Sequence, residues 1–268
     1  MVPLTAGAGA PAGGARAPVT VVIAARDEEA HIAECVASVA GWAAEVLVVE
    51  NDSTDRTVAR AREAGARVFG HPFETIGRQR NAAIARARSP WVLVLDADER
   101  CTPELAGEVA ALVAGAPGAE AFRVRRRNFF LGREIRHGGW ERDRPVRLFR
   151  ARLRYDERPV HEHVVVAGAV GELRAALLHY TYGSLAQYFE KLLRYSRDWA
   201  LQHHARGRRA GPLAVVAKPP ARFVSMYLLR GGFLDGGHGV VLAVLAAVSV
   251  AAKYARLWEL SRGARRAP

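Results

Sequence analysis

The sequence predicts an α/β fold in which a mostly parallel central sheet is flanked by helices. Short apolar runs alternate with segments that carry helix start and stop signals through the first half of the chain. Three of these runs also end on acidic or polar residues. In open α/β sheets the carboxyl ends of the strands form the ligand-binding edge, so the pattern predicts a site as well as a fold.

The expected elements of the first half are four strands and four helices. The strands are 19–25, 45–50, 66–70 and 91–99, and the helices are 27–40, 56–64, 75–88 and one that starts at Thr102-Pro103. Gly41 and Gly65 end the first two helices. Threonine followed by proline is a usual helix start. Strands separated by crossover helices favour a parallel sheet.

The second half of the chain is rich in arginine. We expect strands at 121–132 and 144–156, a hairpin at 161–173, and an amphipathic helix from Ser184 to about His203 that begins with a capping box to Gln187. The domain organisation that follows is a disordered Gly/Ala/Pro-rich tail at 1–17, a catalytic-type domain at 18–205, and a helical extension at 206–268.

The extension contains a conspicuous apolar segment. Val240 to Ala252 is thirteen residues long with only Ser249 polar, short of the roughly twenty residues that span a bilayer. Cations flank neighbouring aromatic and aliphatic residues. We expect this extension to lie on an anionic membrane surface, with a buried core helix as the alternative.

Composition restricts the class of protein. The chain has 268 residues, half of them hydrophobic, and a net charge of +12, which implies an anionic partner such as nucleic acid, a membrane surface or a phosphorylated substrate. Cys35 and Cys101 show no metal or disulfide spacing and predict a reduced protein. The first residues do not resemble a signal peptide. We therefore expect a cytoplasmic protein, peripheral on the inner face of the membrane.

The fourth strand runs into carboxylates, in the sequence VLVLDADER. Asp96 and Asp98 form an Asp-X-Asp pair at the strand end. Carboxylates are the ligands that Mg²⁺ and Mn²⁺ prefer, and such ions typically bind one or two carboxylates together with substrate phosphates. The pair predicts a divalent metal that holds a diphosphate. The alternative is that the two acids only cap the helix after Thr102.

Three motifs in this order resemble family 2 glycosyltransferases with the GT-A (Rossmann-like) fold. They are VVIAARDEE, VVENDSTDRT and RQRNAAIARARSPWVLVLDADE. The later pieces NFFLG, GGWERDRPVRLFR, RPVHEH and LDGGHG resemble the bacterial proteins that add sugars to the lipopolysaccharide core, the beta-glucosyltransferase-like subgroup. The resemblance implies an inverting, metal-dependent hexosyltransferase that uses a nucleotide-sugar donor and an anionic lipid-linked glycan acceptor.

The resemblance also assigns residues to the donor site. Nucleotide-sugar binding is expected at Ala25, Glu28, Glu50, Asn51, Arg80 and Asp96, and metal binding at Asp96 and Asp98. Asn51 departs from a frequent aspartate. Because an amide both donates and accepts hydrogen bonds, the base preference stays open.

An inverting transferase needs a general base for the acceptor hydroxyl. Glu162 in VHEH is our first candidate and Asp143 in GGWERD the second, with Glu141 also possible. Either carboxylate could instead be a salt-bridged surface group. The arginine-rich stretches 123–127 and 142–154 are expected to meet acceptor phosphates, or else to form a solvated basic face.

Two other functions compete with this interpretation. A nucleic-acid-binding protein would use the basic charge with Phe129, Phe130 and Trp140 as stacking groups, but it leaves the acids at the strand ends unexplained, so we expect no nucleic acid partner. A membrane scaffold with a decayed site is compatible with Asn51, whereas the intact Asp96-Ala97-Asp98 argues against it.

Overall fold

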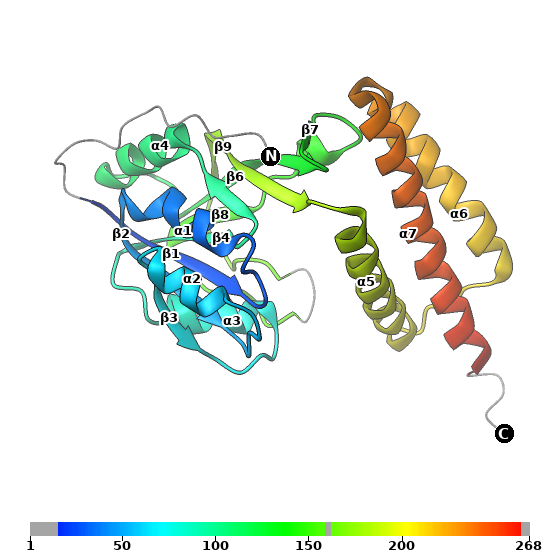
Figure 1. The fold of residues 1–268 in the computed structure, drawn as a ribbon, viewed down its shortest axis with the longest axis horizontal. Helices are drawn as coiled ribbons and strands as arrows, with labels where there is room; N and C mark the ends of the chain where they lie inside the picture. The colour runs from blue at the N-terminus through cyan, green and yellow to red at the C-terminus, as the bar shows by residue number, and fades with distance from the viewer. Residues whose placement is uncertain (1–15, 159–161, 264–268) are drawn as a thin grey trace. The chain divides into compact units, whose positions relative to one another are not determined.

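The computed structural model describes residues 16–158 and 162–263 (Figure 1). Its internal contacts divide the chain into two compact units. The sheet unit comprises the residues up to 127 together with 143–179, and the helical unit comprises 128–142 and the residues from 180 on. Residues 1–15 of the predicted tail lie outside the described residues. The domain boundary after residue 205 stays a prediction.

The described strands form one mixed sheet in the order β3-β2-β1-β4-β8-β6-β9-β5, with β7 paired to β6. β1, β2, β3 and β4 are parallel, whereas β8 is antiparallel to both β4 and β6. The strands are β1 Ala17–Ala25, β2 Ala43–Glu50, β3 Arg67–Gly70, β4 Trp91–Asp96, β5 Glu99–Cys101, β6 Ala121–Phe130, β7 Arg133–Ile135, β8 Val146–Arg150 and β9 Val170–Tyr182.

The central strands β1, β2 and β4 are buried on both faces, as their continuous apolar runs require. Val21 and Ile23 of β1 pack on one face with residues of α1 (Ile32–Ala40), α2 (Thr57–Glu63) and α4 (Pro103–Ala114). Val22 packs on the other face with Ala83 and Ile84 of α3 (Ile76–Ile84). Both cysteines are free and buried in the first of these cores.

The first helix begins five residues later than expected. Asp27 has a φ of 53°, which a helix does not allow. Its carboxylate accepts the backbone N–H of Thr54 at 2.8 Å, so the residues after β1 form a loop tied to the loop after β2. Thr75 and Thr102 do cap α3 and α4, through hydrogen bonds from the backbone N–H groups of Arg78 and Leu105.

The second half of the chain differs more from the expected elements. β4 stops at Asp96 because Glu99 turns back and accepts the Asp96 backbone N–H at 2.7 Å. The expected strand at 144–156 is shortened to β8. Residue 161 of the expected hairpin at 161–173 lies outside the described residues. Over 162–173 the structure has an isolated bridge between Tyr155 and Val164 instead, and β9 begins at Val170.

The helical unit contains α5 Leu185–Ala205, α6 Pro212–Val224 and α7 Gly236–Gly263. A π-helical turn at Ser225–Leu229 and a 3-10 turn at Gly232–Asp235 join α6 to α7. Ser184 caps α5 as expected, by accepting the Gln187 N–H. The core of this unit includes Phe130, Ile135, Tyr188, Leu192, Met226, Leu242, Ala243 and Leu245.

The apolar segment of the extension is longer than its thirteen-residue core suggested. α7 has 28 residues, because its glycines and its last charged turns also continue the helix. Among the described residues, 232–262 is one helical segment long and apolar enough to cross a membrane by length and composition. Such a single helix is weak evidence of a span, since the core helices of soluble proteins can pass the same criterion.

Gly239 is required by a backbone contact inside the helical unit. A Cβ at this position would lie 1.8 Å from the carbonyl oxygen of Gly232, whereas a Cβ at Gly237 would meet no atom within 4 Å. We expect Gly239→Ala to destabilise the unit by about 3 kcal/mol or more. Gly237→Ala should stabilise it by about 0.5–1 kcal/mol, through helix propensity. Thermal unfolding followed by circular dichroism at 222 nm measures both, and equal melting temperatures would contradict the prediction.

Candidate active site

Three strand ends meet at one edge of the sheet. Ala25 of β1 lies in register with Glu50 of β2, and Ala24 lies in register with Asp96 of β4. The acids that end β2 and β4 therefore lie at the same edge of the sheet, with the end of β1 between them. This is the position at which open parallel sheets bind ligands.

The loops after β1 and β2 are interlocked by hydrogen bonds. The Glu28 backbone N–H donates to Thr57 Oγ1 at 2.7 Å, and the Glu29 N–H donates to Asp55 Oδ2 at 2.9 Å. Burial opposes the charge on Asp55, but hydrogen bonds from Thr57 and from backbone N–H groups lower its pKa. The two loops thus form one ordered wall of the edge.

Glu50 and Asn51 lie in this wall. Glu50 Oε2 accepts the Ser53 backbone N–H at 3.1 Å, and a Cβ at Gly70 would come within 3.3 Å of Glu50 Oε1. The Glu50 carboxylate is therefore held by the backbone around it, and the neighbouring Asn51 side chain is buried.

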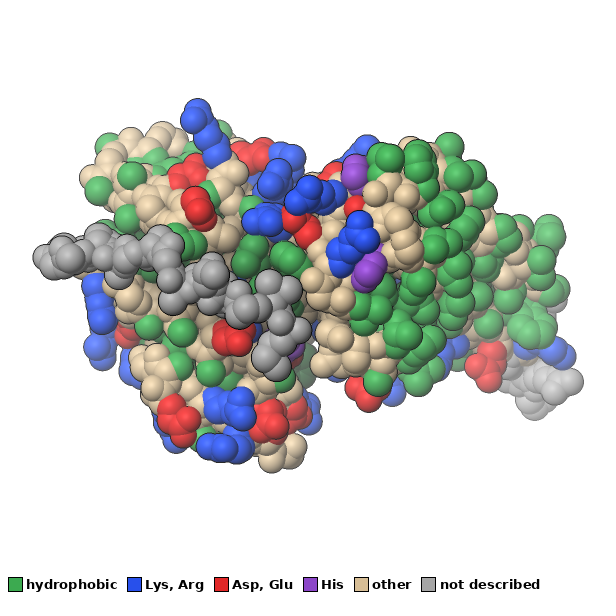
Figure 2. All heavy atoms as spheres, turned by 45° about the horizontal axis from the view of Figure 1, so that its top comes forward, with side chains coloured by type: hydrophobic (Ala, Val, Ile, Leu, Met, Phe, Trp, Pro, Cys, Tyr) green, Lys and Arg blue, Asp and Glu red, His purple; other side chains and the backbone are tan. Residues whose placement is uncertain are grey.

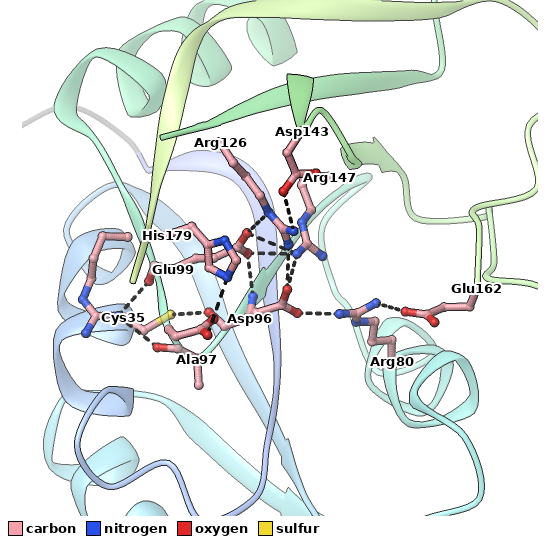
Figure 3. A network of polar contacts seen from close by, with 12 residues as sticks. Cys35, Arg80, Asp96, Ala97, Glu99, Arg126, Asp143, Arg147, Glu162 and His179 are labelled. Atoms are coloured by element: carbon pink, nitrogen blue, oxygen red, sulfur yellow. Dashed lines mark hydrogen bonds and ion pairs between the residues drawn. The ribbon is translucent and has the colours of Figure 1, made fainter. Parts of the chain in front are cut away.

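Arg80 of α3 links two of the predicted site residues (Figure 3). Its guanidinium donates to Asp96 Oδ1 at 2.5 Å and, through Nη1, to Glu162 Oε1. The Tyr155 ring lies against it, 5.2 Å from Cζ to the ring centroid. A Cβ at Gly77 would lie 2.8 Å from the Asp156 carbonyl oxygen, so glycine allows α3 to approach the segment that carries Glu162.

Two more arginines reach the same acids from β6 and β8. Arg126 donates to Asp96 Oδ2 at 2.7 Å and to Glu99 Oε1 at 2.5 Å. Arg147 donates to Asp96 Oδ2 and lies 3.1 Å from Glu99 Oε2. Burial alone would raise the pKa of Asp96, but Arg147, Arg80 and His179 hold it well below its usual range. Asp96 is therefore ionised, with both carboxylate oxygens bound by guanidinium groups.

These contacts correct the expectation that the whole arginine-rich region faces acceptor phosphates. Arg126 and Arg147 point to the interior and contact the carboxyl group of Glu99, which has no exposed surface and whose pKa burial raises to about 8. A local signal for Arg126 was present in the sequence. Arg126 is an even number of residues from Phe122, Val124 and Phe130 in β6. Because alternate residues of a strand point to the same side, it shares their inward face.

The two candidate general bases stand in equivalent positions around Asp96. Glu162 shares Arg80 with it, and Asp143 lies 3.2 Å from Nη1 of Arg126. One guanidinium group thus separates each candidate from Asp96 (Figure 3). Asp143 is half-exposed, and burial together with Asp96 raises its pKa, against the attraction of His179.

Asp98 lies beside a histidine that the sequence analysis did not select. His179 of β9 places Nε2 at 3.6 Å from Asp98 Oδ2, because β9 pairs with β5 through Glu99 and His179. Burial lowers the pKa of His179, but Asp98, Glu99 and Asp96 raise it overall. Within the described residues no group of three or more His, Cys, Asp or Glu side chains could hold a metal by itself.

Comparison with known proteins decides the family. Residues 20–180 match glycosyl transferase family 2. The chain belongs to this family. As a family 2 glycosyltransferase it has the GT-A fold, and the strand-end site described above lies inside the matched region.

Relatives of this family 2 glycosyltransferase match nearly its full length. It is 29% identical to the lipopolysaccharide core biosynthesis glycosyltransferase LpsC of Rhizobium meliloti, over 89% of this chain and 93% of that protein. It is 26% identical to an uncharacterized glycosyltransferase of Rickettsia typhi, over 91% and 87%. Glucosyl-3-phosphoglycerate synthase from Mycobacterium tuberculosis, solved with Mg²⁺ and UDP, is 23% identical over 41% of this chain and 44% of that one, with a TM-score of 0.37.

Proposed function

We propose that this glycosyltransferase moves a sugar from a nucleotide-sugar to a lipid-linked or lipopolysaccharide-core glycan, with inversion at the sugar C1. The observation that carries the proposal is the position of Asp96, which lies at the strand-end edge and is joined through one guanidinium group to each of two carboxylates. The similarity to LpsC along 93% of its length supports the choice of acceptor class.

The donor would occupy the edge formed by the ends of β1, β2 and β4. Ala25, Glu28, Glu50 and Asn51 would contact the base and ribose, and Arg80 and Asp96 would contact the ribose and diphosphate side. The register of the three strands and the interlocked loops support this arrangement, because they hold these positions before any ligand binds.

The donor set near Asp98 fits Mn²⁺ or Mg²⁺. The Asp98 carboxylate is an oxygen ligand that suits either ion, and such ions complete their coordination with substrate phosphates. The neighbouring His179, whose pKa Asp98 raises, would contact this carboxylate rather than the metal. Asp96 was predicted as a second ligand, but its two oxygens are engaged by arginines. We therefore propose Asp98 as the main metal-binding carboxylate. When bound, the metal would neutralise the diphosphate leaving group.

Glu162 is the proposed general base, with Asp143 as the second candidate. The acceptor oxygen forms its bond to C1 as the bond from C1 to the diphosphate breaks, and the electron pair leaves with the nucleoside diphosphate. The hydroxyl proton passes to the carboxylate. Arg80 holds Glu162 one guanidinium group away from Asp96, which supports a base within reach of an acceptor hydroxyl at the expected donor site.

We propose that the protein works at the cytoplasmic face of the membrane, with the helical unit on an anionic surface. This unit carries the apolar helix α7. Between residues 206 and 263 there are nine Lys and Arg residues against two acids. Nucleic acid binding is not favoured, because the buried arginines Arg80, Arg126 and Arg147 are paired with carboxylates.

Calorimetric titration with UDP, GDP, ADP and CMP, each with and without Mn²⁺, tests the donor site. We expect one nucleotide to bind in the presence of Mn²⁺, and Asp98→Asn to weaken that binding at least a hundredfold, since loss of an outer partner alone costs about 10–100-fold. Asp198→Asn, an exposed carboxylate on α5, is the matched control. Absence of binding by all four nucleotides to the folded protein would refute the donor-site assignment.

A further inference from the structure

Three cations of the helical unit lie close enough to repel one another. Arg222 belongs to α6, Lys253 to α7, and Arg230 follows the π-helical turn Ser225–Leu229. The charge of Arg230 acts on Arg222, and the charge of Arg222 acts on Lys253. The three side chains, which we call the cation row, therefore have Arg222 in the middle.

The cation row has no counter-charge within the part of the chain that the structure describes. No carboxylate there forms an ion pair with Arg222, Arg230 or Lys253. The acid nearest to Arg230 in the chain is Asp235, which is buried and binds the backbone N–H and ring of His137 instead. Burial lowers the pKa of Arg222 and of Lys253, and the neighbouring cation lowers each further. A bound anion would relieve this repulsion.

The side chains of the cation row are held by contacts with the rest of the unit. The Arg230 guanidinium lies on the backbone of Gly139, where a Cβ would come 2.7 Å from Arg230 Nη1. Lys253 Nζ lies 6.0 Å from the centroid of the Trp199 ring of α5. Arg222 and Lys253 are both half-buried. Donors that are held before a ligand arrives lose less freedom when it binds.

The donor groups around Arg222 fit a phosphate. Tyr188 of α5 is close enough for the charge of Arg222 to act on it, but burial raises the pKa of Tyr188 to about 12, so the phenol keeps its proton. Guanidinium, ammonium and phenol groups all donate hydrogen bonds. A phosphate group has several acceptor oxygens and the opposite charge, so it can meet several of these donors at once.

Apolar side chains next to the cation row favour a phosphate that belongs to a lipid. Val224, Leu228 and Leu229 lie between Arg222 and Arg230 in the chain and are 42%, 53% and 78% exposed. Figure 2 shows hydrophobic side chains over a broad area of the helical unit. A lipid offers hydrocarbon together with its phosphate, whereas a soluble phosphoester would leave these side chains in water.

We propose that Arg222, with Arg230 and Lys253 beside it, binds the phosphate group of an anionic lipid. The inference rests on the proposed location of the helical unit at a membrane surface and makes it specific. The buried arginines of the sheet unit were expected to meet phosphates but are paired with acids. The cation row supplies such a contact instead.

Calorimetric titration of the full chain with dihexanoyl phosphatidylglycerol tests the site. This short-chain lipid is used below its critical micelle concentration, so that no charged membrane surface contributes to binding. We expect Arg222→Gln to weaken binding by about tenfold or more, because it removes a charge-assisted hydrogen bond to the phosphate. Arg208→Gln removes an exposed arginine between α5 and α6 and, as the matched control, should change the affinity little.

Lysine NMR provides a second readout that needs no substitution in the cation row. Lys191, Lys218 and Lys253 are the three lysines of the sequence, so after ¹³C-methylation the Lys253 signal is the one that Lys191→Arg and Lys218→Arg both retain. Binding of dihexanoyl phosphatidylglycerol should raise the pKa of Lys253, because a nearby anion favours the charged form. Dihexanoylglycerol has the same acyl chains without the phosphate and should not raise it. This measurement decides the question even if Arg222→Gln does not fold, which circular dichroism reveals.

Glycerol 3-phosphate distinguishes a lipid phosphate from a soluble one. It should bind about tenfold more weakly than the lipid or worse, since it has no hydrocarbon to cover the neighbouring apolar side chains. Equal affinities for glycerol 3-phosphate and dihexanoyl phosphatidylglycerol would overturn the assignment to a lipid.

The outcomes also separate this inference from the proposed function. Equal weakening by Arg222→Gln and Arg208→Gln, or an unchanged pKa of Lys253 in the presence of the lipid, would overturn the phosphate site even if nucleotide titration supported the transferase. Weakening by Arg222→Gln alone, in a protein that binds none of the four nucleotides, would support the phosphate site and refute the proposed donor site.

Discussion

Glu162→Gln should lower kcat by about 10²–10⁴-fold while changing nucleotide affinity little. An amide cannot take the proton of the acceptor hydroxyl, but its oxygen can still accept the hydrogen bond that Arg80 donates to Glu162. Release of nucleoside diphosphate in the presence of acceptor measures kcat, and calorimetry measures the affinity. Glu157→Gln, an exposed carboxylate of the same segment that pairs with Arg78, is the matched control and should remain active.

Asp143→Asn decides between the two candidate bases. If Glu162→Gln stays within about threefold of the wild type and Asp143→Asn loses the activity, the assignment to Glu162 is wrong and the role belongs to Asp143. The pH profile provides a second readout. A base must be deprotonated, so kcat falls as the pH drops through its pKa. Burial and Asp96 raise the pKa of Asp143. If Asp143 is the base, the fall of kcat at low pH should therefore occur above the ordinary aspartate pKa of about 3.9.

Arg147→Met should destabilise the sheet unit by about 3–5 kcal/mol. The Arg147 side chain is 3% exposed and meets the carboxylates of Asp96 and Glu99. Methionine occupies part of the space but leaves these buried acids with less positive charge. Urea unfolding measures the change in the free energy of unfolding, and a lower midpoint with an unchanged slope would identify it as lost stability.

Two comparisons make this prediction specific. Arg123→Met, on the exposed face of the neighbouring strand β6, should change the free energy of unfolding by no more than about 0.5 kcal/mol. Adding Glu99→Gln to Arg147→Met should recover part of the loss, because it replaces a fully buried carboxyl group that Arg147 contacted and whose ionised form burial disfavours. Similar unfolding midpoints for Arg147→Met and Arg123→Met would contradict the role given to the buried pair.

The first half of the fold could be predicted because its signals are local. The apolar runs correspond to β1 to β4, and Thr75 and Thr102 cap α3 and α4 as expected. The prediction failed where a contact from a distant segment overrides local preference. Asp27 was placed at the start of a helix, but its carboxylate binds Thr54 and its backbone adopts a positive φ.

The candidate site also has a part that could be predicted from the sequence and a part that only the tertiary structure decided. The sequence by itself determined that Glu50, Asn51, Asp96 and Asp98 lie at or just after the ends of strands of one sheet, because strand ends and sheet direction follow from periodicity and crossover rules.

Only the tertiary structure decided which side chains bind Asp96. Arg126 and Arg147 lie 30 and 51 residues from Asp96 in the chain, and Glu162 lies 82 residues from the Arg80 that joins it to Asp96. Strand periodicity can show that an arginine points inward, but its partner depends on which strands become neighbours. Here the sheet order β4-β8-β6 brings two arginines to Asp96 of β4 and Glu99 of β5.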